Sequence, residues 1–264
     1  MTYITVLVEN TSLNKNIKAE HGLSIYIENE YEKILFDTGA TDAFADNAEK
    51  LGINLASVDA AVISHGHYDH GGGIKKFLEI NDHAPVYLSC NAFEDYYNNE
   101  YKYIGLDKKL IDCNRIVMVR DYMKIGEKSA IISHRNLKDI FPTKSYGLLK
   151  KENGKFIDDD FMHEQYLIVK DGGKKILFNG CAHRNIFNII CNLKPDIFFG
   201  GFHFMKIEVV NEKNEELDLA ADILGSLDTV YYTGHCTGIK QYEYLKKKMG
   251  KQINYISGGS TIKI

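Results

Sequence analysis

The sequence predicts an α/β fold, a sandwich of two mixed β-sheets with helices on the outer faces. Short apolar, β-branched runs recur along the 264 residues, and helical patterns fall between the later runs. The run ILFDTGA at 34–40 also returns as ILFNGCA at 176–182, each copy followed by a helix and a strand. This repeat indicates either two related halves, each a sheet covered by helices, or a chance similarity of buried strands.

The predicted strands end at Gly, Asn or Asp and lie at 3–8, 23–28, 33–39, 59–64, 84–89, 115–119, 129–133, 165–170, 174–180, 195–201, 229–234 and 253–259. The predicted helices lie at 41–52, 73–81, 185–194, 216–227 and 238–250. The polar, tyrosine-rich stretch 91–114 predicts a helix plus an irregular loop, inserted as a lid. No Pro/Gly-rich linker divides the chain, so residues 1–264 are expected to form one domain.

The amino-acid composition argues against some classes of binding partner. A formal charge of −4, with lysines scattered among acids, argues against a non-specific nucleic-acid binder. No run approaches the roughly twenty apolar residues of a membrane span. Five widely spaced cysteines without a C-x-x-C pair indicate reduced thiols, and no secretory signal is visible, so a cytoplasmic location is expected. The expected partner is a small anionic molecule, with no nucleic acid and no membrane; a homodimer is left open.

The stretch SHGHYDHGGG at 64–73 contains the residues that indicate a metal-binding site. His65 and His67 follow a buried strand, and residues two apart in extended chain point the same way, so both can bind one metal ion. Asp69 and His70 lie past the turn and can face a second ion. Imidazole and carboxylate together are typical ligands of Zn, Mn or Fe(II). The three glycines would turn the chain into a helix whose N-terminus is open to an anionic group.

These residues resemble the metallo-β-lactamase fold superfamily, and the resemblance spans nearly the whole chain. Within it, later motifs resemble the branch of metal-dependent hydrolases related to 7,8-dihydropterin-6-methyl-4-(β-D-ribofuranosyl)aminobenzene-5′-phosphate synthase. The motifs that carry the resemblance are SHGHYDHGGG (64–73), ILFDTG (34–39), NGCAHRNIFNI (179–189), GGFHF (200–204) and TGHCTGIKQYEYLKKKMG (233–250). The resemblance implies a four-layer αββα sandwich.

The resemblance also implies roles for single residues. The first metal-binding motif falls on His65, His67, Asp69 and His70. His235 falls on the last histidine of the superfamily, a ligand of the second metal. Asp37 falls on a buried carboxylate that would orient a ligating histidine through its free ring N–H.

The middle ligands depart from the superfamily pattern. Cys181 stands where an aspartate is expected at the end of ILFNGCAH. Either a solvent hydroxide then provides the bridge between the ions, or Cys181 contributes a thiolate. His183 is favoured as the third histidine ligand of the first metal, because GCAH is the branch's own motif and lies at a strand end. His163, in FMHEQYLIV, is the other candidate.

Two further residues have open roles. His203 ends an apolar strand and would either bind a substrate phosphate or act as a general acid at the pocket mouth, or else be a histidine satisfied near the core. Arg184 would either hold an anionic group of the substrate or be a solvated surface residue. Histidines without the strand–glycine pattern are interpreted as ordinary: His21, His83 and His134.

The sequence thus predicts a binuclear metal-dependent hydrolase. Two divalent ions, zinc or alternatively manganese or iron, would present a metal-bound hydroxide to a phosphoester or another small anionic metabolite, pterin- and nucleotide-like molecules included. Asp69 would bind one ion and orient the hydroxide. One alternative is an iron oxidoreductase of the dioxygenase type on the same fold. Another is a catalytically inactive metal-binding or sensor protein.

Overall fold

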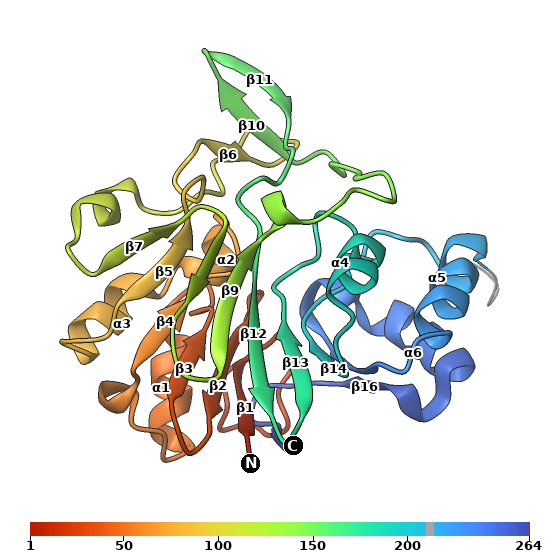
Figure 1. The fold of residues 1–264 in the computed structure, drawn as a ribbon. Helices are drawn as coiled ribbons and strands as arrows, with labels where there is room; N and C mark the ends of the chain where they lie inside the picture. The colour runs from red at the N-terminus through yellow and green to blue at the C-terminus, as the bar shows by residue number, and fades with distance from the viewer. Residues whose placement is uncertain (210–213) are drawn as a thin grey trace.

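Two facing β-sheets form the centre of the computed structural model, which describes residues 1–209 and 214–264 (Figure 1). Within those residues, the first sheet has seven strands in the order β17-β1-β2-β3-β4-β5-β7. In that order the strands are Thr261–Lys263, Tyr3–Val8, Ser24–Glu28, Lys33–Phe36, Ala60–Val62, Val86–Ser89 and Ile116–Val119. Pairing is antiparallel from β17 to β3 and parallel from β3 to β7.

The second sheet has the same design. Its seven strands in the described residues follow the order β16-β15-β14-β13-β12-β9-β8. They are Ile253–Tyr255, Val230–Thr233, Ile197–Phe199, Lys174–Phe178, Gln165–Asp171, Ser129–Ser133 and Tyr122–Lys124. Pairing is antiparallel from β8 to β13 and parallel from β13 to β16.

The sequence repeat occupies equivalent places in the two sheets. Its copies form β3 and β13, the strands at which each sheet changes from antiparallel to parallel pairing. Each is followed by a helix, α1 or α4, and then by the next parallel strand, β4 or β14. This shared topology favours two related halves over a chance similarity.

Helices cover the outer face of each sheet, which completes the predicted four-layer αββα sandwich (Figure 1). The helices are α1 (Ala43–Lys50), α2 (Tyr68–Gly71), α3 (Ile74–Ile80), α4 (Ile186–Leu193), α5 (Glu215–Gly225) and α6 (Ile239–Met249). The 3-10 turns are η1 (Leu55–Ser57), η2 (Lys108–Asp112), η3 (His134–Asn136), η4 (His235–Thr237) and η5 (Gly250–Gln252). None of the described helices is both long and apolar enough to cross a membrane.

Alternation along the strands separates three apolar cores. In β3, Leu35 packs on the helices of the first half, whereas Phe36 points into the space between the sheets. In β13, Leu177 packs on α4–α6 and Phe178 faces the same central space. The predicted strands and helices outside 91–114 all correspond to observed elements, usually with shorter bounds.

The stretch 91–114 differs from the prediction. All of it is described, and it contains strand β6 (Tyr96–Tyr97) and turn η2 but no α-helix. β6 pairs with β10 (Leu149–Glu152), which forms a hairpin with β11 (Lys155–Asp158). This small sheet projects above the sandwich (Figure 1). The tyrosines belong to it: Tyr97 packs edge-on against Phe156 of the hairpin, at 5.0 Å between ring centroids. Contacts with a distant hairpin therefore overrode the local helical pattern.

Replacing Phe178 with alanine is expected to destabilise the sandwich by about 3–5 kcal/mol, since it removes a buried ring from between the sheets. Phe178 is fully buried, and its ring lies 5.2 Å from that of Phe199 and 5.9 Å from that of Phe36. Urea unfolding followed by circular dichroism measures the loss. The control is Phe156→Ala on the exposed hairpin, expected to cost less than about 1 kcal/mol; equal losses would contradict the expectation.

Candidate metal centre

Chemically active side chains follow strands of both sheets where parallel pairing brings the strand ends together. Asp37 follows β3, His65 follows β4, Cys181 follows β13, His203 follows β14 and His235 follows β15. Three of them have left-handed backbone, with φ of 58° at Asp37, 58° at His203 and 49° at His235. Such conformations are costly outside glycine and are found mostly at functional sites. The two halves of the molecule thus contribute to one site.

The first cluster contains His65, His67 and His183, whose ligand atoms all lie within 4.8 Å of one another. The Nε2 atom of His65 and both ring nitrogens of His183 are buried and have no hydrogen-bond partner among the described residues, and the buried Nε2 of His67 has only an Asp159 carboxylate oxygen 3.7 Å away, beyond hydrogen-bond distance. Burial also lowers the pKa of each of the three imidazoles, which favours the neutral form that binds metals. Because unpaired buried nitrogens are costly, their convergence fits a bound metal ion.

His163, the other candidate for the third histidine, has both nitrogens engaged. Its Nδ1 accepts the N–H of Gly66 at 2.7 Å, so a neutral ring carries its proton on Nε2, which lies 3.2 Å from an Asp159 carboxylate oxygen. The ring also stacks on Tyr96 at 4.0 Å. The arrangement therefore favours His183 as the ligand and His163 as a residue that supports the histidine loop.

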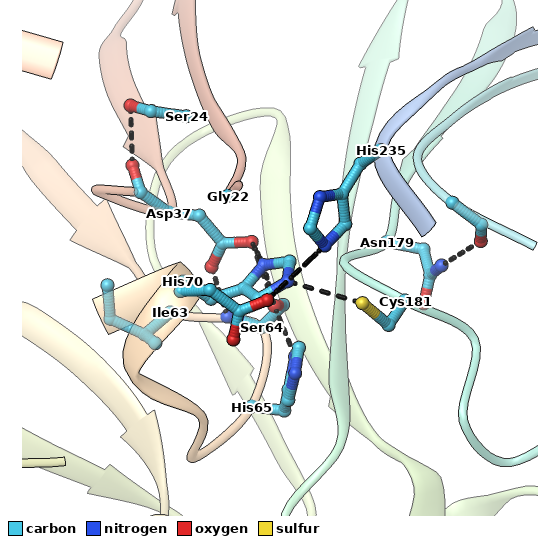
Figure 2. A network of polar contacts seen from close by, with 12 residues as sticks. Gly22, Ser24, Asp37, Ile63, Ser64, His65, His70, Asn179, Cys181 and His235 are labelled. Carbon is cyan, nitrogen blue, oxygen red and sulfur yellow. Dashed lines mark hydrogen bonds and ion pairs between the residues drawn. The ribbon is translucent and has the colours of Figure 1, made fainter. Parts of the chain in front are cut away.

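The second cluster gathers around His70 and draws on both halves (Figure 2). The Nε2 of His70 lies 3.1 Å from His235 Nε2 and 3.2 Å from Cys181 Sγ. An Asp69 carboxylate oxygen lies 3.5 Å from His235 Nε2 and 3.7 Å from His70 Nε2. Carboxylate, imidazole and thiol donors at these separations can hold one divalent ion. Cys181 thus lies among the possible donors, at the position where the superfamily pattern has aspartate.

Side chains behind the second cluster set the tautomers of its histidines. Asp37 accepts from His70 Nδ1 at 2.7 Å and from the N–H and hydroxyl of Ser64 (Figure 2). Asn10 Oδ1 accepts from His235 Nδ1 at 2.8 Å. Both histidines therefore direct an unprotonated Nε2 toward the cluster when neutral, as metal binding requires. Asp37 lies where the resemblance implied; Asn10 was not identified from the sequence.

Two buried glutamates hold the loops that carry the ligands. Glu164 accepts the backbone N–H of His183 at 2.8 Å, and Glu9 accepts that of His235 at 2.5 Å. Both are fully buried. Neither glutamate was identified from the sequence, because neither lies in a recognisable motif, although Glu164 directly follows His163. The hydrogen bond from the His235 N–H to Glu9 helps to hold His235 in its left-handed conformation.

A cavity of about 190 Å³ opens onto both clusters. Its wall includes Asn98 and Ile104 from the inserted stretch 91–114, together with Leu148, Met205 and Lys206. This stretch therefore contributes to the wall of the cavity, although its structure differs from the one predicted. The glycines after His70 do not line this cavity: a Cβ on Gly72 would lie 2.2 Å from the carbonyl oxygen of Ala40, so the turn packs tightly on the preceding loop instead of presenting an open helix N-terminus.

His203 lies between this cavity and a smaller one. It lines both, its ring centroid is 4.4 Å from that of His183, and neither ring nitrogen has a hydrogen-bond partner among the described residues. The smaller cavity, about 50 Å³, is bounded by aromatic rings of Tyr146, Phe187 and Phe202. The alternative in which His203 is a hydrogen-bonded histidine of the core therefore does not fit. Its side chain faces the cavity in which a substrate would lie.

His21 belongs to the site, contrary to its interpretation as an ordinary histidine. Its Nε2 lies 3.4 Å from an Asp69 carboxylate oxygen, and its ring centroid lies 4.9 Å from that of His235. It also lines the larger cavity. His21 follows no strand, and only the packing of its loop brings it to Asp69.

The position of Arg184 does not fit the predicted role in substrate binding, because its side chain lies in a buried network and not at the cavity. It is buried, donates to the Asp160 carbonyl at 2.7 Å and pairs with Asp139. It is not among the described residues lining either cavity. His134, likewise expected to be ordinary, joins this buried network through Asp139 at 3.0 Å. The network supports the His183 loop from behind.

We expect the affinity of the metal-free protein for a divalent ion at the second cluster to rise about tenfold per pH unit between pH 7 and 9. Burial by itself lowers the pKa of His70, but the carboxylates of Asp37 and Asp69 outweigh it and raise the pKa to about 9. His70 is therefore protonated at neutral pH and must release its proton to bind the ion. Titration calorimetry in buffers of different ionisation enthalpy measures that release.

The matched control for this expectation is Asp37→Asn, which removes a carboxylate that raises the pKa of His70 and should reduce the proton release. Because the pKa of folded His70 is raised, its contribution to stability is present below about pH 6.5 and lost as the pH rises through about 9. Metal affinity that stayed constant from pH 7 to 9 would contradict the assignment.

The fold is an αββα sandwich. Its candidate metal centre lies where strand ends of the two sheets come together. The chain belongs to the metallo-β-lactamase superfamily, whose family model matches residues 17–235. The family expected from the sequence is thereby confirmed, as is the fold class.

Three relatives cover almost the whole chain. The uncharacterised protein MJ0448 of Methanocaldococcus jannaschii is 28% identical, over 97% of this chain and 96% of its own. The 7,8-dihydropterin-6-methyl-4-(β-D-ribofuranosyl)-aminobenzene-5′-phosphate synthase of the same organism is 28% identical, over 98% and 95%. The crystal structure of Tm1679, described as a metal-dependent hydrolase of the β-lactamase superfamily, has a TM-score of 0.86 and 27% identity, covering 100% of this chain and 99% of that one.

Proposed function

We propose that the protein is a binuclear metal-dependent hydrolase acting on a phosphoester or another small anionic metabolite. The observation that carries the proposal is the convergence of buried ring nitrogens from His65, His67 and His183, none of which has a hydrogen-bond partner among the described residues, beside a second cluster around His70. Divalent ions bound there would lower the pKa of a water molecule and polarise a phosphoryl or carbonyl oxygen.

The residues of the chain divide the remaining work. Asp69 lies at the cavity wall between His21 and His235, where its carboxylate can orient the attacking water and take up its proton. His203 faces the cavity from the opposite half with both nitrogens free, so it can donate a proton to the leaving group or hold an anionic oxygen. Lys206 adds a positive charge to the same wall, which favours an anionic substrate.

A second candidate function is the condensation named for the M. jannaschii synthase. Its support is similarity along 98% of this chain to that relative, which carries a synthase name. The apolar wall of the cavity, with Tyr68, Ile104 and Leu148, suits the organic part of a substrate in either reaction.

A metal-supplemented substrate screen tests the proposal. Chelated protein is reloaded with Zn, Mn or Fe and offered phosphomonoesters, cyclic phosphodiesters, thioesters and lactones. We expect hydrolysis of at least one phosphoester class, lost on chelation and restored by metal. A separate arm offers a 7,8-dihydropterin that carries a leaving group on its 6-methyl carbon, together with 4-(β-D-ribofuranosyl)aminobenzene 5′-phosphate as the acceptor, and product formation there alone favours the synthase. Stoichiometric iron with oxygen uptake and no hydrolysis would instead establish an oxidoreductase.

A further inference from the structure

Two buried thiols lie at the second cluster, one from each of two neighbouring strand ends. Cys181 follows β13 and Cys236 lies in η4 after β15, with side chains only 3% and 2% exposed. The ligand atoms of Cys181, Cys236 and His235 all lie within 4.8 Å of one another. Both cysteines line the larger cavity. The sequence pattern indicates Cys181 as a possible thiolate donor and indicates no role for Cys236.

The backbone leaves room for the second sulfur. A Cβ on Gly201 would lie 2.2 Å from Cys236 Sγ, so only glycine at that position permits the thiol to lie where it does. Cys236 Sγ lies 3.4 Å from the Cys181 carbonyl oxygen, a weak contact that a thiolate–metal bond can replace. Adjacent residues already converge in this site, since Asp69 and His70 are neighbours in sequence. His235 and Cys236 repeat that arrangement from the opposite half.

We propose that Cys236 is a ligand of the second metal position together with Cys181, so that this ion is held by two thiolates as well as by His70 and His235. Asp69 then keeps a carboxylate oxygen free to orient water. The inference rests on the proposed function only in requiring an ion at this position. Two sulfur and two nitrogen donors form a set that favours Zn²⁺ and other thiophilic cations over Mn²⁺ or Mg²⁺.

Cadmium and cobalt spectroscopy tests the donor set without relying on activity. Chelated protein is titrated with Cd²⁺ or Co²⁺, and the sulfur-to-metal charge-transfer absorption is measured per bound ion. We expect a two-thiolate band in the unaltered protein, reduced by about half in both Cys181→Ser and Cys236→Ser because each removes one of two sulfur donors. The control Cys90→Ser, which removes an exposed thiol, should leave the band unchanged.

X-ray absorption fine structure of the unaltered, zinc-loaded protein counts sulfur neighbours directly, so the result does not depend on a variant folding. Because the signal averages over both zinc ions, an average of about one sulfur neighbour per zinc, that is two thiolates for two ions, supports the proposal. An average of about half a sulfur per zinc, or a band that Cys181→Ser abolishes and Cys236→Ser leaves intact, would overturn it while leaving the hydrolase proposal standing. Failure to bind any ion would overturn both.

Discussion

Replacing Asp69 with alanine is expected to lower turnover of any accepted substrate by on the order of 10²- to 10⁴-fold, the loss typical of removing a positioned general base. The carboxylate is nine-tenths buried at the cavity wall, with an oxygen 3.4 Å from His21 Nε2 and 3.5 Å from His235 Nε2. Its removal takes away both a donor to the second metal position and the group that orients the attacking water. Steady-state kinetics with saturating metal measures the effect.

Two controls separate these roles. Metal content of the Asp69→Ala variant, measured by mass spectrometry of the protein-bound ions, shows whether the second ion is retained. The second control is His21→Ala, which removes a half-exposed side chain next to the Asp69 carboxylate. It should lower turnover much less than Asp69→Ala does. Unchanged turnover in Asp69→Ala with every accepted substrate would contradict the enzyme assignment and favour a metal-binding or sensor protein.

Replacing His183 with alanine is expected to weaken metal binding at the first cluster by more than about 100-fold, beyond the 10- to 100-fold typical of losing an orienting partner of a ligand. His183 offers two unpartnered buried nitrogens, and its ring stacks on Phe161 at 4.5 Å, which fixes its orientation toward His65 and His67. Competition with a chromophoric chelator measures the affinity of each ion, and turnover should fall in parallel.

The matched variant is His163→Ala, which removes the competing candidate from the same cluster. Since His163 is engaged with Gly66 and Asp159, its loss should leave two ions bound and reduce affinity by no more than about 100-fold. The opposite ranking, with His163→Ala losing an ion that His183→Ala keeps, would assign His163 as the ligand.

The related halves of the molecule account for how two clusters come to share one cavity. β3 and β13 hold the same place in their sheets, and their ends carry Asp37 and Cys181. The following parallel strands, β4 and β14, end near His65 and His203. Packing the two sheets face to face through Phe36, Phe178 and their neighbours brings these strand ends together. The candidate metal centre therefore lies at the junction of the halves.

Much of the secondary structure could be predicted from local features of the sequence. Periodicity indicated the individual strands and helices, because buried strands and amphipathic helices leave patterns of short range, whereas the four-layer sandwich was implied by the resemblance to the family. The stretch 91–114 was predicted wrongly, since its conformation depends on pairing between β6 and β10, more than fifty residues apart. A segment whose partner is distant carries no local signal of its structure.

By itself the sequence determined the family and the class of fold, and it predicted the first group of donors, His65, His67, Asp69 and His70. Spacing along a strand end and its turn is enough to direct neighbouring side chains toward common points. Only the tertiary structure decided which remaining residues meet them: it favoured His183 over His163, added His21 and Cys236, and placed Arg184 in a buried network away from the cavity. Those residues come from distant segments, and sheet pairing and side-chain packing, not sequence spacing, set the distances between them.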